Sequence, residues 1–341
     1  MTIKLGLDTF GDISSDENGN SISAAQTIRN VVEQAVVADQ TGVDAFGIGE
    51  HHRDDYAVSS PEMVLAAIAS KTEKISLGSA VTVLSSDDPV RVFQRFSTLD
   101  AVSNGRAEIM AGRGSFVESF PLFGYSLSDY DDLYAEKLDL LHELVKEKPV
   151  TWSGRTRAAL HNQNVYPHTE TGKLKLWVAV GGTPSSVMRA AHYGLPVAFA
   201  IIGGAPGNFK PLVDLYKKAV EEEHSFSNPV GMHSMGHVAE TDAQAREEFY
   251  PYYETFHNRL GAERGWGRLT PPRFLQEIEH GSLYVGSPET VGKKIASTVK
   301  TLGVERFDLK YATGEMPHSS LVKSVELYGT KVASIVKNEL S

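Results

Sequence analysis

The chain contains no cysteine in its 341 residues, which excludes disulfides, thiolate catalysis and cysteine-ligated metal sites. No window approaches the roughly 18 consecutive apolar residues that a transmembrane helix needs. Basic residues are outnumbered, 33 Lys and Arg against 43 Asp and Glu, for a formal net charge of −10. This balance argues against nucleic acid or an anionic membrane as the main partner, since both need a basic face. The N-terminal run 1–8 is too short and too polar for a signal peptide, and we expect a soluble cytoplasmic protein.

Apolar runs of strand length alternate with segments of helical periodicity along the whole chain. Apolar runs bounded by glycine are typical of strands buried on both faces of a parallel sheet. This alternation predicts an α/β protein with one (β/α)8 TIM barrel domain over residues 1–341. A doubly wound open sheet is the competing interpretation, but Thr9-Phe10-Gly11-Asp12 after the first strand is not a dinucleotide-binding glycine fingerprint. The expected strands are 3–8, 45–49, 75–84, 106–111, 176–180, 196–202, 230–238 and 306–310.

Two stretches depart from this alternation. Residues 150–170 lack a helical pattern, and we expect a short hairpin excursion there. Residues 261–284 are rich in glycine, arginine and proline, and we interpret them as an irregular insertion that serves as a lid. Trp266 in that segment either closes over a ligand or anchors the loop.

Ionisable side chains crowd the end of the second expected strand, where Glu50, His51, His52 and Arg53 follow one another. Parallel α/β enzymes place their active-site residues at the C-terminal ends of strands. Adjacent residues on a strand point to opposite sides, which speaks against both histidines binding one metal, and we expect no metal site. One of the two can face a pocket. A lone histidine at a strand end is more often structural, but the neighbouring carboxylate and the loops described next favour a functional one.

Two glycine-containing loops follow other expected strands. The stretch Gly181-Gly182-Thr183-Pro184-Ser185-Ser186 lies between a strand and a helix, where backbone N–H groups, the helix N-terminus and hydroxyls suit a phosphate. A tight turn with a threonine N-cap is an equal alternative. Arg113, between Gly112 and Gly114, carries a guanidinium that suits phosphate or a ring carbonyl, with a surface arginine as the alternative. Together these loops suggest one phosphorylated ligand between them.

Small residues occupy the third expected strand near its end, at Gly78-Ser79-Ala80-Val81-Thr82. Small side chains let a flat ring lie against backbone. From residue types alone, however, a tapering barrel core explains this stretch better.

These motifs, taken together, resemble the bacterial-luciferase-like family of flavin-dependent monooxygenases over nearly the whole chain. The resemblance depends on several short motifs that occur in the family's order and with similar gaps. They are Gly49-Glu50-His51-His52, the block 77–84 with Asp88-Pro89-Val90-Arg91, Leu99-Asp100 through Gly105-Arg106, Gly112-Arg113-Gly114 with Phe123-Gly124, and Gly181-Gly182-Thr183-Pro184.

The resemblance implies a barrel with an insertion, commonly dimeric, that binds reduced FMN at its C-terminal mouth. His51 corresponds to the family's catalytic histidine, with Glu50 beside it. The flavin ring would lie near a non-proline cis peptide at Ala80–Val81, next to Ser79. The phosphate contacts would fall on Arg113 and on the loop with Gly181, Gly182, Thr183 and Ser185.

The sequence departs from the family's luciferases in two places. They have Glu-Ser where Gly181-Gly182 stand, which leaves backbone amides rather than a serine hydroxyl as the main phosphate donors. Arg53 replaces an aromatic residue beside the histidines, which implies a more polar substrate side than a fatty aldehyde requires.

The expected reaction is therefore that of a flavin-dependent monooxygenase. Reduced FMN from a separate NAD(P)H:flavin reductase would react with O₂ to a C4a-hydroperoxyflavin, which oxidises a small organic substrate. His51 would act as general base or as hydrogen-bond donor to the peroxy group. One alternative is an F420-dependent hydride-transfer enzyme, disfavoured because no extra basic cluster awaits the polyglutamate tail of that cofactor. The other alternative is a non-catalytic flavin-binding homologue. The presence of Glu50, His51 and Arg113 argues against it.

Overall fold

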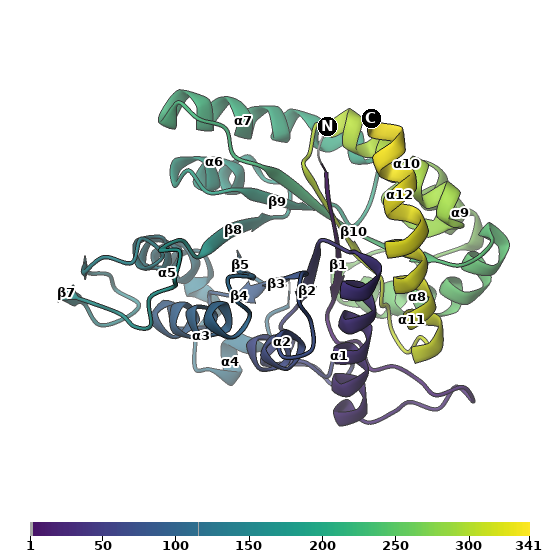
Figure 1. Cartoon of the computed structure of the whole chain (residues 1–341), viewed down its shortest axis with the longest axis horizontal. Helices are drawn as coiled ribbons and strands as arrows, with labels where there is room; N and C mark the ends of the chain where they lie inside the picture. Colours follow the sequence, from purple (N-terminus) through teal and green to yellow (C-terminus); the bar gives the residue numbers. More distant parts are fainter. Residues whose placement is uncertain (1–2, 115) are drawn as a thin grey trace.

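The computed structural model describes residues 3–114 and 116–341, and its centre is a closed barrel of parallel strands (Figure 1). Each strand pairs with its neighbour in the order β1–β2–β3–β5–β8–β9–β10–β12, and β12 pairs back with β1. The predicted (β/α)8 barrel is confirmed, and the open doubly wound sheet is wrong because the ring closes. The barrel strands are β1 (Lys4–Thr9), β2 (Ala45–Ile48), β3 (Ser76–Ser79) with β4 (Thr82–Val83), β5 (Ala107–Gly112), β8 (Lys175–Val180), β9 (Val197–Ala200), β10 (Val230–Val238) and β12 (Arg306–Lys310).

Helices surround the barrel, and their N-termini carry the caps that the sequence signals. Ser23, Asp88 and Ser287 each accept a hydrogen bond from the first turn of the helix that follows, and glycines in the left-handed conformation end α1 and α10. The helices are α1 (Ala24–Thr41), α2 (Pro61–Ala69), α3 (Pro89–Val102), α4 (Ser119–Leu122), α5 (Tyr130–Leu144), α6 (Pro184–His192), α7 (Lys210–His224), α8 (Asp242–Arg264), α9 (Pro271–Glu279), α10 (Pro288–Leu302), α11 (His318–Leu327) and α12 (Ala333–Leu340). None of these helices is long and apolar enough to cross a bilayer.

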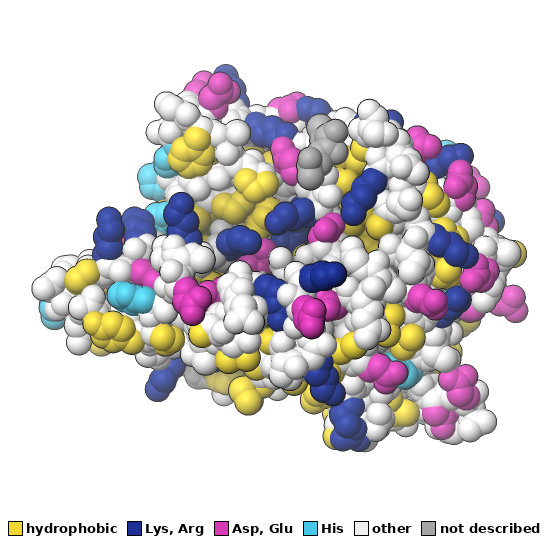
Figure 2. Space-filling model, in the orientation of Figure 1, with side chains coloured by type: hydrophobic (Ala, Val, Ile, Leu, Met, Phe, Trp, Pro, Cys, Tyr) yellow, Lys and Arg dark blue, Asp and Glu magenta, His cyan; other side chains and the backbone are white. Residues whose placement is uncertain are grey.

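The interior of the barrel is charged, whereas the layer between strands and helices is apolar. Along β1, Leu5 and Leu7 are buried in the hydrophobic core, while Asp8 belongs to the opposite, inward side. Arg306 of β12 donates to Asp308 at 2.7 Å and to Glu108 across the barrel, so the buried guanidinium has paired carboxylates. Buried charges require such partners. The outer surface in Figure 2 is different, with Lys and Arg scattered among Asp and Glu.

Of the predictions for the two irregular stretches, one is confirmed and one is wrong. Residues 150–170 contain the antiparallel hairpin of β6 (Val150–Trp152) and β7 (Leu160–Gln163), as predicted. The interpretation of 261–284 as irregular is wrong. Helix α8 continues through Gly261 to Arg264, α9 follows after a short loop, and β11 (Tyr284–Gly286) pairs with the end of β10.

Local signals explain this correction. Gly261 lies inside α8, and Trp266 packs close to it, since an added Cβ would lie 3.2 Å from the Trp266 Cβ. Gly265 ends the helix in the left-handed conformation, and Thr270 caps α9. The glycines and prolines of the segment therefore mark helix ends.

The third expected strand, 75–84, is interrupted. β3 ends at Ser79, and β4 begins at Thr82. Between them the Ala80–Val81 peptide bond is cis, as the family resemblance implies. The break turns the backbone of 80–81 toward the mouth of the barrel.

Candidate functional site

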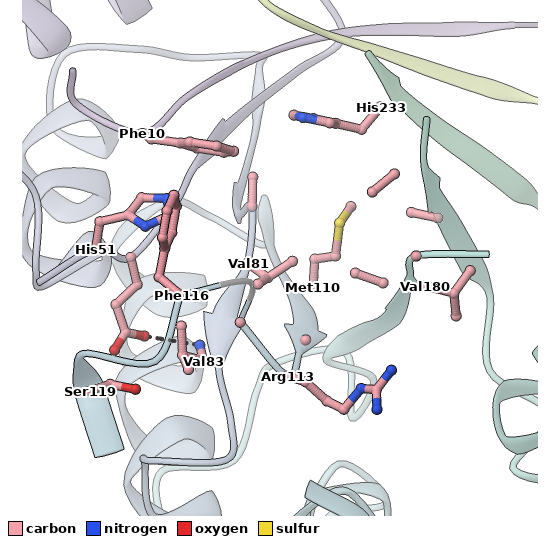
Figure 3. Close-up of a pocket in the computed structure, with 18 of the residues that line it drawn as sticks. Phe10, His51, Val81, Val83, Met110, Arg113, Phe116, Ser119, Val180 and His233 are labelled. Carbon is pink, nitrogen blue, oxygen red and sulfur yellow. Dashed lines mark hydrogen bonds between the residues drawn. The ribbon is translucent and has the colours of Figure 1, made fainter. Parts of the chain in front are cut away.

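A cavity of about 330 Å³ opens at the C-terminal ends of the barrel strands (Figure 3). Its walls come from the ends of all barrel strands except β12, so segments far apart in sequence meet there. Among the residues singled out from the sequence, the cavity is lined by Glu50, His51, Ala80, Val81, Arg113 and Gly181. Its largest part is apolar, which suits a small organic ligand or cofactor.

Four predicted residues do not line the cavity. Ser79 is buried between β3 and β5, where its hydroxyl donates to the Met110 carbonyl at 3.2 Å and accepts from the Met110 N–H at 3.1 Å. Gly182 has a φ of 104° and faces the ring of Phe209. Thr183 and Ser185 lie at the start of α6, behind Gly181.

His51 lies in an aromatic cage at one end of the cavity. Its ring is 4.3 Å from that of Tyr56, 4.7 Å from Phe10 and 5.1 Å from Phe116, measured between centroids. No described residue forms a hydrogen bond with the ring. Burial, followed by the positive charges of Lys310, His52 and Arg53, lowers the pKa of His51 to about 3. The imidazole is therefore neutral near pH 7 and a weak base, an environment that favours hydrogen bonding over general-base catalysis.

Glu50 connects the end of β2 to β4. One carboxylate oxygen is 2.9 Å from His52 Nε2, and the other accepts the Val83 N–H at 3.0 Å (dashed in Figure 3). The β4 side of the break at Ala80–Val81 is thus linked through Glu50 to His52.

Hydrogen-bond donors gather at the opposite end of the cavity, around Arg113 and the start of α6. Arg113 Nη1 donates to Asp131 at 2.9 Å, and Nη2 donates to Ser186 Oγ at 3.4 Å. Ser186 opens α6, whose N-cap Thr183 makes no capping hydrogen bond through its side chain. An added Cβ at Gly181 would meet no atom within 4 Å, so the space beside this backbone is open. A phosphate group fits this set of a guanidinium, hydroxyls and helix N–H groups.

Between these two ends the wall is flat and apolar. Val81 and Ala179 pack against a small buried cluster of Met110, Trp177 and Ala198, and most of these side chains face the cavity. Short side chains here leave space for a planar ring against the backbone at the cis peptide. The site thus places an apolar wall between the neutral imidazole of His51 at one end and the Arg113 guanidinium with the start of α6 at the other.

Sequence reasoning missed several wall residues, notably Phe10, Phe116 and His233. His233 lies in the expected strand 230–238, and the two-residue alternation along that strand was the available signal. Among the described residues, no cluster of His, Asp and Glu could hold a metal ion.

The end of α8 borders the mouth of this cavity. Arg53, which the sequence analysis assigned to a polar substrate side, donates to Glu118 at 2.7 Å and to Glu263 of α8 at 2.8 Å. Arg264 lies over the Phe116 ring at 5.4 Å. Arg53 lines a second cavity of about 300 Å³, which shares Phe116 with the first.

Solved structures resemble this fold along its whole length. The monooxygenase RslO1 from Streptomyces bottropensis superposes with a TM-score of 0.84 at 22% identity, over 97% of this chain and 99% of that one. The FMN complex of the oxygenating constituent of 3,6-diketocamphane monooxygenase from Pseudomonas putida gives 0.75 at 20%, over 98% and 99%. The coenzyme F420-dependent tetrahydromethanopterin reductase from Methanopyrus kandleri gives 0.72 at 18%, over 98% and 99%. At these identities the likeness shows the shared fold, which serves both flavin and F420 proteins.

Sequence comparison identifies the family directly. The family model described as luciferase-like monooxygenase matches residues 9–306, which include every wall of the cavity. The match agrees with the resemblance inferred from the short motifs and with the fold of the solved structures. The chain belongs to the luciferase-like monooxygenase family.

Proposed function

We propose that this protein is a monooxygenase that uses reduced FMN and O₂ to oxidise a small organic substrate. The observation that carries the proposal is a single cavity with an anion-binding end at Arg113, a flat apolar wall at Ala80–Val81 and a neutral imidazole at His51. FMN has matching features, a flat ring system at one end and a negatively charged phosphate at the other. Family membership supports the reaction class.

In this proposal the phosphate binds between Arg113 and the N-terminus of α6. Gly181 and Gly182 let backbone N–H groups approach it, and the hydroxyls of Thr183 and Ser185 add donors. Ala80 and Val81 would contact the ring, while Ser79 would act behind them by joining β3 to β5.

Reduced flavin supplies the electrons that activate O₂. The protein's own contribution is to position the reactants and keep water away. Phe10 and Phe116 cover His51 with apolar surface, and in this dry environment a hydrogen bond from a neutral imidazole is strengthened. Glu50 holds the backbone of β4 in place beside it.

The lid is proposed to be narrower than the segment 261–284. Only its beginning, the last turn of α8, reaches the cavity mouth through the Arg53–Glu263 ion pair and Arg264. Breaking that ion pair would free the mouth for substrate entry.

A deazaflavin (F420) enzyme is the second candidate, favoured by the shared fold with the Methanopyrus kandleri reductase. The negative charges near Arg113 argue against a deazaflavin cofactor. Asp131 and Asp132 stand in the first turn of α5, and Asp131 contacts Arg113. Carboxylates at this position would repel a polyglutamate tail.

The partners in the proposal are a separate NAD(P)H:flavin reductase and a second copy of the chain, in the cytoplasm. Light scattering on the purified protein tests the homodimer, and a generic flavin reductase tests the supply of reduced flavin.

The central test is oxygen incorporation. The protein is incubated with FMN, NADH, a generic flavin reductase and a substrate library under heavy-oxygen-labelled O₂, and products are analysed by mass spectrometry. A monooxygenase transfers one labelled atom to product, and His51→Gln lowers that transfer while FMN still binds. Turnover with reduced F420 in the absence of oxygen would instead identify the deazaflavin enzyme. Binding of FMN without product in any reaction would indicate a non-catalytic homologue.

A further inference from the structure

Across the cavity from β3, another imidazole besides those of His51 and His52 lines the wall. His233 of β10 lines the wall, and its ring lies nearly parallel to that of Phe10, at 5.9 Å and 8° (Figure 3). Its Nδ1 is 2.7 Å from a carboxylate oxygen of Asp8, on β1. Asp8 is 1% exposed, so this pair is formed away from water.

The barrel makes room for this carboxylate with a glycine. A Cβ added at Gly47 of β2 would lie 2.0 Å from Asp8 Oδ1, so any larger residue would force the carboxylate to shift. The same oxygen is buried without a hydrogen-bond partner among the described residues. Among the described residues, His233 is therefore the hydrogen-bond partner of the Asp8 carboxylate.

This arrangement fixes which ring nitrogen carries the proton. An ionised carboxylate accepts hydrogen bonds only, so Nδ1 must be the N–H donor. In the neutral ring Nε2 then bears a lone pair, and no described residue forms a hydrogen bond to it. Asp8 also stabilises the imidazolium that forms when Nε2 takes up a proton, the role a buried carboxylate plays behind a catalytic histidine.

His233 and His51 thus differ in their surroundings. His51 is buried among aromatic rings with positive charges nearby, and no carboxylate of the described residues forms a hydrogen bond with its ring. His233 has a carboxylate in contact, and the other charged groups near Asp8 are Arg306 and Asp308 of β12. Lys310, also on β12, lies over the ring of Phe10, with its Nζ 4.7 Å from the ring centroid.

We propose that His233 is the catalytic proton acceptor of this site and that the substrate is a phenol or enol, whose acidic hydroxyl it deprotonates. The O–H bond breaks, the proton moves to Nε2, and the electron pair stays on the substrate oxygen. No electrons are exchanged in this step. The oxyanion enriches the adjacent ring carbon in electrons, which prepares it for oxidation. An alkyl alcohol is too weak an acid for an imidazole, whereas a phenol is not.

The aromatic walls support the same substrate class. A planar phenol or enol can stack beside Phe10 with its hydroxyl toward Nε2, since His233 and Phe10 already lie parallel. This inference rests on the proposed function for the oxidation that follows, but proton transfer itself needs neither oxygen nor reduced flavin.

The test uses 4-nitrophenol, whose phenolate absorbs visible light and whose phenol form does not. The protein is saturated with oxidised FMN, and the bound probe is titrated with acid. In the wild type we expect the bound probe to remain phenolate down to a pH about one unit lower than the free probe. His233→Gln should abolish the shift, and Asp8→Asn, which keeps an acceptor but removes the charge, should reduce it.

The matched control is His237→Gln. His237 lies on the same strand, is fully buried and pairs with Glu248 at 2.8 Å, but does not line the cavity. This variant should keep the shift. Normal FMN affinity in each variant verifies folding. A wild-type probe that fails to bind or titrates as it does in water, or a shift that survives His233→Gln, would overturn the inference. Because the probe is not oxidised, a retained shift with no oxygen incorporation in the substrate screen would refute the monooxygenase proposal alone.

Discussion

Replacing Arg113 by alanine should weaken FMN binding through the phosphate and leave the ring contacts intact. The guanidinium is partly exposed, donates to Asp131 at 2.9 Å and reaches Ser186 of α6. A hydrogen bond to a charged group contributes about 1.5–3 kcal/mol. Freeing Arg113 from an exposed ion pair costs about 0–1 kcal/mol. The net loss is about 0.5–3 kcal/mol, or roughly 2- to 160-fold in Kd.

Fluorescence titration with two ligands isolates the phosphate. FMN should lose this affinity in Arg113→Ala, whereas riboflavin, which has the same ring and no phosphate, should change by less than about twofold. Asp131→Asn should act in the opposite direction and tighten FMN binding by up to about fivefold, because the competing carboxylate is gone.

Arg155→Ala serves as the control. Arg155 also pairs with a carboxylate of α5, Asp132, but its side chain is 76% exposed and it does not line the cavity. Its loss should leave FMN binding unchanged. Equal losses for FMN and riboflavin in Arg113→Ala, or no loss for either, would remove Arg113 from the phosphate site.

Three further predictions concern the walls of the cavity. Glu50→Gln should lower the free energy of unfolding in urea by about 1–2 kcal/mol and weaken FMN binding, since one of the two hydrogen bonds that the Glu50 carboxylate forms is lost. Gly47→Ala should destabilise by about 1–3 kcal/mol, because its Cβ would lie 2.0 Å from Asp8, whereas Gly203→Ala, with open space around it, should change stability by less than about 0.5 kcal/mol. The pKa of His51 is lowered from 6.5 to about 3 in the folded protein. Between these two pH values the folded state binds fewer protons than the unfolded state, so the stability that this residue contributes above pH 6.5 is lost as the pH falls. His51→Gln should therefore flatten the decline in unfolding free energy between pH 7 and 5 by up to about 2 kcal/mol, and an unchanged slope would contradict the burial of this ring.

The sequence by itself determined the features that depend on neighbours along the chain. The period of apolar residues located the strands of the barrel, and short motifs located the ends of strands that carry His51 and Arg113. The hairpin in 150–170 followed from its lack of helical pattern. Glycines and prolines in 261–284 were ambiguous, because the same residues mark an irregular loop or the ends of two helices.

Only the tertiary structure decided which side chains meet. Closing the barrel brings β10 within reach of β1, so His233 contacts Asp8 across 225 positions of sequence. Barrel closure also buries Ser79 against β5 and lets Glu50 accept a hydrogen bond from the β4 backbone. It buries the His51 ring, and this burial, followed by nearby positive charges, lowers the pKa of His51 so that the ring stays neutral. The physical reason is that the burial, electrostatic field and hydrogen bonds of a side chain depend on its neighbours in three dimensions. In a parallel barrel those neighbours come from strands that are far apart in the sequence.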